Sequence, residues 1–149
     1  MKVVTAPEMR PLSFLVGEWK TEGEIHDEAS AVKQRVSGQD RYEWVSGGSF
    51  LLHRVDVNMG NERVEVIELI GSGGTKKDDG FAMHSFDNQG RITVMKGHLE
   101  QPNIFKIEGD GLRSKLEVAE DGKVMLITWE QFSHGTWNLW ITMTLTKKK

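Results

Sequence analysis

Short segments of alternating apolar and polar residues, separated by turns that contain glycine, constrain this fold more than any other sequence feature. Turn-forming residues recur at short, even intervals, as at 46–48, 87–90 and 109–111. This spacing is typical of consecutive antiparallel hairpins. Parallel strands would need long crossover connections, and no stretch between the turns has a helical pattern of that length. The segments that we predict as strands are 18–25, 33–44, 49–57, 63–71, 80–86, 91–99, 103–108, 112–119, 123–130 and 136–147.

The last of these segments has the clearest alternation, with one apolar face and one mostly polar face that only Trp140 interrupts. The apolar face consists of Trp137, Leu139, Ile141, Met143 and Leu145. Many such strands in succession leave unpaired edges unless the sheet closes on itself. We therefore predict an all-β fold, one closed antiparallel up-and-down barrel of about ten strands over residues 1–149. Residues 7–15 are expected to form a short helical plug before the first strand.

Composition and charge restrict the function. The 149 residues are 38% hydrophobic with a net charge of −3, which fits one globular domain without a general attraction to nucleic acid. No apolar run approaches the roughly 20 residues of a membrane-spanning helix. Residues 1–10 contain Pro7 and Glu8 and lack the apolar core of a secretion signal. We expect a cytoplasmic protein without nucleic-acid or membrane partners.

A Gly-x-Trp motif opens the first predicted strand, at Gly17 and Trp19, and resembles the signature of lipocalins and the wider calycin group. The resemblance implies that Trp19 closes one end of the barrel and that a basic residue of the last strand, here Lys147, packs across it. Segments 15–19, 47–51, 85–90 and 137–140 together resemble a bacterial family of unknown function, described as having a lipocalin-like barrel. That resemblance implies the fold and supplies no catalytic residues.

A more distant resemblance is to nitrobindin, whose ten-stranded barrel holds haem through a histidine near its C-terminal end. Residues 140–149 contain no histidine, and the last one in the chain is His134, before the final strand. A fixed axial ligand is needed to hold haem iron. We therefore predict that the protein has no native haem or other cofactor, and haem binding remains the alternative.

No local motif indicates catalysis or a metal site. The histidines at 26, 53, 84, 98 and 134 have no compact ligand spacing, and the chain has no cysteine. No nucleophile–base motif is present. We interpret Glu68 and Glu130 as facing solvent at strand ends, with an inward carboxylate as the alternative for each. The pattern favours a binding protein over an enzyme, although a small barrel enzyme that uses lumen histidines stays open as an alternative.

A closed barrel of this size has room for a ligand, and we predict that it binds a small, largely apolar molecule. The phase of the middle strands decides which side chains face inward. Among the five tryptophans, Trp44 and Trp140 are candidates for an exposed surface, which leads to the hypothesis of a homodimer. The residues predicted to line the lumen are Trp137, Leu139, Ile141, Met143, Trp129, Phe86, His84, His53 and His98.

Overall fold

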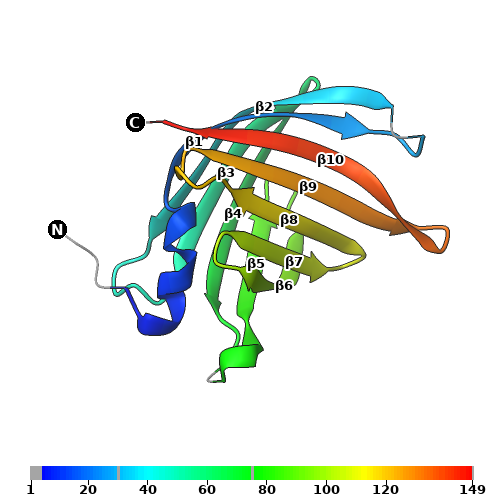
Figure 1. Ribbon diagram of the computed structural model, residues 1–149. Coiled ribbons are helices and arrows are strands. Elements are labelled where there is room, and N and C mark those ends of the chain that lie inside the picture. The colour runs from blue at the N-terminus through cyan, green and yellow to red at the C-terminus, as the bar shows by residue number, and fades with distance from the viewer. Residues whose placement is uncertain (1–4, 30, 75, 149) are drawn as a thin grey trace.

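The computed structural model describes residues 5–29, 31–74 and 76–148, which form a closed antiparallel barrel of ten strands (Figure 1). Each strand pairs with its neighbours in sequence, and β1 (Gly17–His26) also pairs with β10 (Thr136–Lys147). This last pairing closes the sheet, as the sequence predicted. The remaining strands are β2 (Val32–Trp44), β3 (Leu51–Met59), β4 (Glu62–Ser72), β5 (Phe81–Asp87), β6 (Ile92–Gln101), β7 (Ile104–Gly109), β8 (Leu112–Val118) and β9 (Val124–Ser133).

Alternation along the strands separates an inner face from an outer face. In β8, Ser114, Leu116 and Val118 are buried, whereas Arg113, the residue before Ser114, is exposed. Successive side chains of a strand point to opposite sides of the sheet. Residues paired across neighbouring strands share a side, so the register assigns each position to the inner or the outer wall.

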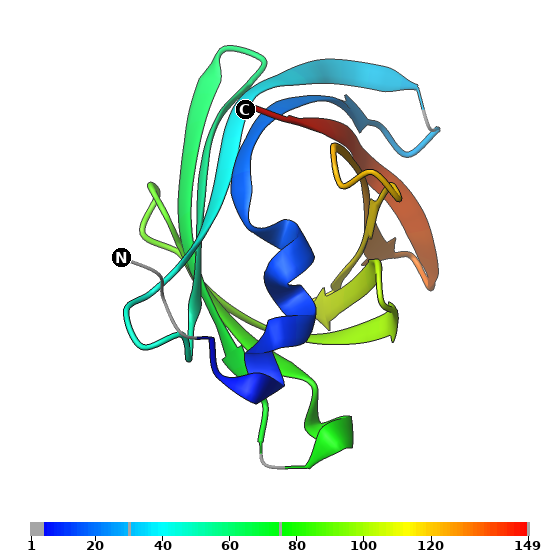
Figure 2. The same ribbon diagram turned by 60° about the vertical axis from the view of Figure 1, so that its left-hand side comes forward.

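A short 3-10 helix, η1 (Pro7–Leu15), precedes β1 and covers one end of the barrel (Figure 2). Its side chains Met9, Leu12 and Leu15 are fully buried and belong to the main hydrophobic cluster. Pro11 lies within the helix, where it does not interrupt this burial. The N-terminal plug that the sequence predicted is therefore present. A second 3-10 turn, η2 (Lys77–Asp79), lies in the connection between β4 and β5.

The buried apolar side chains form two clusters along the barrel axis. The larger one packs against η1 and includes Trp19 and Phe105. The smaller one consists of Val36, Val57 and Ile141. These three residues lie toward the end where β1 turns into β2 and β9 turns into β10, which is the end opposite η1. The core is therefore densest at the plugged end.

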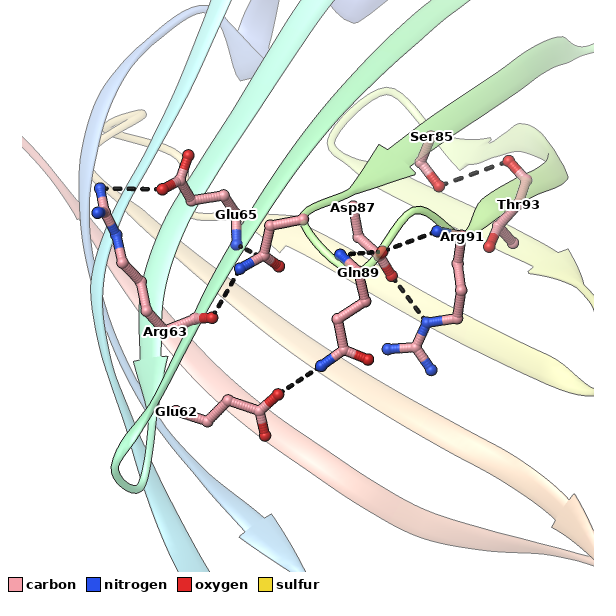
Figure 3. Close-up of polar contacts among 9 residues, drawn as sticks. Glu62, Arg63, Glu65, Ser85, Asp87, Gln89, Arg91 and Thr93 are labelled. Carbon is pink, nitrogen blue, oxygen red and sulfur yellow. Dashed lines mark hydrogen bonds and ion pairs between the residues drawn. The ribbon is translucent and has the colours of Figure 1, made fainter.

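Polar contacts join two neighbouring hairpins at the end away from η1 (Figure 3). In the β5–β6 turn, the side chain of Asn88 accepts a hydrogen bond from the backbone of Glu65 and donates one to the carbonyl of Arg63. Asp87 accepts hydrogen bonds from the backbone N–H groups of Gln89 and Arg91. These contacts fix the rim of the barrel. Within the described part of the chain, no helix is long and apolar enough to cross a membrane.

Candidate functional site

The Gly-x-Trp motif lies where η1 meets the barrel. Trp19 is fully buried, and its indole N–H donates a hydrogen bond of 2.9 Å to the carbonyl of Leu15. Lys147, its partner across β1 and β10, places Nζ 5.3 Å from the centre of the indole ring. Gly17 makes this approach feasible, because a Cβ atom there would lie 2.6 Å from Cε of Lys147. These residues therefore hold the plugged end together.

The register divides the residues predicted to line the lumen into two groups. Trp129, Ile141 and Met143 lie on the inner wall near the far end, where Ile141 belongs to the small apolar cluster and the other two pack against it. His53 also faces inward, between the buried residues Leu51 and Val57. These four predicted positions are therefore together inside the barrel.

Five predicted positions lie on the outer wall, so the expectation that they face the lumen is corrected. In β5 and β6, His84, Phe86 and His98 are exposed because Met83 and Met95 set the inward phase. In β10, the pairing register shifts between Leu139 and Ile141. That irregularity reverses the phase and leaves Trp137 and Leu139 outside. Trp137 contacts Phe132 and Arg113 there.

The inner wall of β1 to β4 carries a hydrogen-bonded polar cluster centred on His53. Its Nε2 lies 2.7 Å from Oδ2 of Asp40, and its Nδ1 lies 3.1 Å from Oε1 of Glu68. The hydroxyl of Thr21 donates to Oδ1 of Asp40. The ring of Tyr42 stacks on the imidazole, with centroids 3.9 Å apart and planes at 7°. We call these five residues, Thr21, Asp40, Tyr42, His53 and Glu68, the His53 cluster.

The register explains how five distant residues meet. Tyr42 pairs with His53, and His53 pairs with Glu68, so three ring and carboxylate side chains lie side by side on adjacent strands. Asp40 is the preceding inward position on β2, next to Trp19 on β1. The cluster therefore lies in the half of the barrel nearer to η1, on the lumen side of this helix.

The two carboxylates determine the charge state of His53. Burial by itself would lower the pKa of this imidazole, but hydrogen bonds to Asp40 and Glu68, together with their charges, raise it to about 9. The ring is therefore protonated at neutral pH, and both of its nitrogens donate. Burial, followed by the same two carboxylates, raises the pKa of Tyr42 well above its ordinary value. The cluster thus holds one positive and two negative charges.

The inner wall remains partly accessible beyond the plug. The side chains of His53 and Glu68 are 12% and 14% exposed to solvent, compared with 7% for Asp40. Farther from η1, several inward-facing apolar residues are only half-buried: Val55, Met59, Val64, Val66, Trp129 and Met143. A polar cluster at the base and a partly exposed apolar wall above it are the usual elements of a small-molecule site.

The rim of the barrel at the plugged end has a separate groove. It has a volume of about 600 Å³ and lies between η1, the β4–β5 connection and β6. Pro11, Phe81, His98 and Leu99 contribute to its lining. His98 therefore belongs to this groove and not to the lumen.

The inner wall does not fit a haem or a metal ion. Both nitrogens of His53 are occupied by carboxylates, so neither has a free lone pair for iron. His134 lies in the β9–β10 turn, where its side chain is 82% exposed and outside the lumen. Among the described residues, no group of three or more His, Cys, Asp or Glu side chains is arranged to hold a metal ion.

Sequence reasoning identified only one member of the His53 cluster. The preferred interpretation placed Glu68 in solvent, and the structure corrects this in favour of the inward alternative, because β4 pairs with β3 in the register that places Glu68 beside His53. Glu130 lies outside, in an ion pair with Arg113. Asp40 and Tyr42 had no motif around them. The available signal was their spacing: Asp40, Tyr42 and the half-buried Trp44 are two residues apart and therefore lie on the same face of β2.

The fold and its plug define a class of protein, the lipocalin-like barrels. The chain belongs to the family described as a protein of unknown function, DUF1579, whose model matches residues 5–147. No curated protein matches the chain.

Two solved structures are similar in fold. Rv2717c from M. tuberculosis has a TM-score of 0.70 and 12% identity, covering 98% of this chain and 100% of its own. The S-type phycobiliprotein lyase CPES from Guillardia theta has a TM-score of 0.60 and 12% identity, covering 91% of this chain and 89% of its own. At this identity, the likeness concerns the fold alone.

Proposed function

We propose that the barrel binds a small, largely apolar molecule in its lumen without transforming it, with the polar end of that molecule at the His53 cluster. The observation that carries this proposal is a hydrogen-bonded His–Asp–Glu cluster on the inner wall that keeps residual exposure. Well-packed apolar residues of similar volume are often at least as stable as buried ion pairs. Three ionisable side chains at this position are therefore better explained by a binding role than by stability.

The apolar part of the inner wall supplies affinity. Half-buried side chains such as Val66, Trp129 and Met143 lose further exposed area when a ligand covers them. Each Å² of apolar surface removed from water contributes about 25 cal/mol before the costs of association are subtracted. The phycobiliprotein lyase named above has a similar fold, which is consistent with ligand binding by a barrel of this shape.

The two alternative functions have weaker support. A general base needs a free lone pair near neutral pH, and the imidazole of His53 is doubly hydrogen-bonded with a pKa of about 9. An axial haem ligand needs the same free nitrogen. Both alternatives depend on lumen histidines, and His84 and His98 lie outside.

A lumen-filling variant tests the proposal. Nile red, a neutral environment-sensitive dye, is titrated into the wild type, Met143→Trp and Thr144→Trp. Met143 is half-buried and faces the lumen, whereas its neighbour Thr144 is exposed and faces outward, so the two variants add bulk on opposite sides of one strand. We expect saturable binding by the wild type, a loss of about tenfold or more in Met143→Trp, and unchanged affinity in Thr144→Trp. Equal binding by all three proteins would contradict the proposal.

We also propose that two copies associate through the outer wall of β4, β5 and β6. Ile67, Phe86 and Ile92 lie side by side on these strands, and Leu69 and Val94 flank them. All five are exposed, by 38% to 68%, and form one contiguous apolar patch of the kind that marks an interaction surface. Homodimer interfaces are about 65% apolar, more than the rest of a protein surface. A contiguous apolar patch on one outer wall therefore fits a second copy of this chain.

Trp44 and Trp140, which first led to the homodimer hypothesis, do not form this surface. Both are half-buried and pack against the two core clusters. Sedimentation velocity of the wild type, Ile92→Glu and Leu126→Glu tests the revised interface. Leu126 is also exposed, by 54%, but lies on β9. We expect Ile92→Glu alone to yield a monomer, and a monomeric wild type would refute this interface.

A further inference from the structure

The inner wall around the His53 cluster is acidic. Asp40 and Glu68 contribute two negative charges and His53 contributes one positive charge. From β1 to β6, the inward positions of the described residues include no lysine or arginine that would balance the remaining charge. Arg91, in the turn before β6, is paired with Asp87, the inward-facing last residue of β5. Lys147 on β10 is held over Trp19 at the plug.

We propose that the ligand carries a cationic, hydrogen-bond-donating group of the ammonium or amidinium class, and that Glu68 receives it. This inference rests on the proposed lumen binding and specifies the chemistry of the ligand's polar end. An anionic end, such as the carboxylate of a fatty acid, would meet the two carboxylates of the cluster and be repelled.

The hydrogen-bond pattern selects Glu68 over Asp40. Both oxygens of Asp40 already accept, from Thr21 and from His53. Glu68 uses only Oε1 for His53, and among the described residues its Oε2 has no hydrogen-bond partner. Glu68 is also the more exposed of the two carboxylates, 14% against 7%. An incoming donor therefore finds its free acceptor at Oε2 of Glu68.

The facing wall has a second polar group without a partner. Ser114 on β8 lies halfway around the ten-strand barrel from β3, faces inward and is only 4% exposed. Its Oγ has no hydrogen-bond partner among the described residues. Buried polar atoms without partners are rare in folded proteins. A ligand with a further polar group on its body would supply the missing partner.

Three ligands with the same apolar chain test the proposal: decylammonium, decanol and decanoate, each below its micelle concentration. Their affinities are measured by displacement of bound Nile red from the wild type, Glu68→Gln and Glu65→Gln. Glu65 is the matched control, because it lies on the same strand but faces outward, in an ion pair with Arg63.

We expect decylammonium to bind the wild type about tenfold or more tightly than decanoate, with decanol between them. Glu68→Gln should abolish this order, and Glu65→Gln should retain it. Decanoate binding as tightly as decylammonium, or an unchanged order in Glu68→Gln, would overturn the inference. The wild-type comparison stands alone should Glu68→Gln not fold.

The two proposals fail in different ways. Binding of Nile red without displacement by decylammonium would overturn the ligand class and leave lumen binding intact. Absence of any Nile red binding, together with absence of binding by all three decyl ligands, would overturn both.

Discussion

Replacement of His53 by glutamine should remove both stability and a defined pH dependence. His53→Gln keeps similar bulk but leaves Asp40 and Glu68 in the wall without their shared cation. Removal of one partner from a buried ion pair costs about 3–5 kcal/mol. We therefore expect the free energy of unfolding to fall by about that amount at pH 7, when measured by urea denaturation with tryptophan fluorescence.

The wild-type pH profile gives an independent magnitude. The pKa of His53 rises from 6.5 to about 9, which corresponds to roughly 3 kcal/mol at about 1.36 kcal/mol per pH unit. Because the folded state has the higher pKa, this stabilisation is fully present below pH 6.5 and is lost as the pH rises through about 9. Stability should therefore decline between these two values.

Other shifted groups titrate outside this window. The pKa values of Asp56 and Asp87 are lowered by hydrogen bonds from Arg63 and from Arg91, so these carboxylates titrate in acid. The raised pKa of Tyr42 affects stability only above its ordinary value of 10.

The control for this experiment is His84→Gln, on the outer wall of β5. It should change stability by less than about 0.5 kcal/mol and retain the pH profile. A wild type whose stability is flat between pH 6.5 and 9, or a His53→Gln protein that keeps the decline, would refute the assignment of a charged His53.

Three further predictions concern the plug, the facing wall and haem. Trp19→Ala should lower the free energy of unfolding by about 3–5 kcal/mol in urea denaturation, because it removes a fully buried indole; a loss below about 1 kcal/mol would contradict its role. Ser114→Ala should leave stability unchanged or raise it by up to about 1 kcal/mol, since it removes a buried hydroxyl without a partner; a clear loss would show that this hydroxyl has a partner in solution. Titration with hemin should give no sharp stoichiometric Soret band, and a band that disappears in His134→Ala would show the opposite.

The fold was predictable because its signals are local. Alternation within a strand and glycine in a turn depend on residues close in sequence, so the ten strands and the closure follow from the pattern. The plug was also local, in residues 7–15 followed by Gly17 and Trp19. Strand ends differ from the predicted ones by a few residues.

The site was less predictable because it depends on phase and register. A single irregularity in the pairing between Leu139 and Ile141 moves Trp137 to the outer wall. No residue type at this point of the sequence predicts the irregularity. In β5, the inward residues Phe81, Met83 and Ser85 and the outward residues Ala82, His84 and Phe86 each mix apolar and polar side chains, so the phase was ambiguous. The His53 cluster required the pairing of four strands at once, which the sequence of one strand does not encode.

Histidine side-chain NMR tests the central claim most directly, because the described residues place His53 inside the barrel and His84 and His98 outside. Ring resonances are recorded during titration with decylammonium, decanol and decanoate in turn. We predict saturable shifts of the His53 ring with at least one of these ligands, while the rings of His84 and His98 stay unchanged. Shifts confined to His84 or His98, with His53 unaffected, would place the ligand on the outer wall and contradict lumen binding.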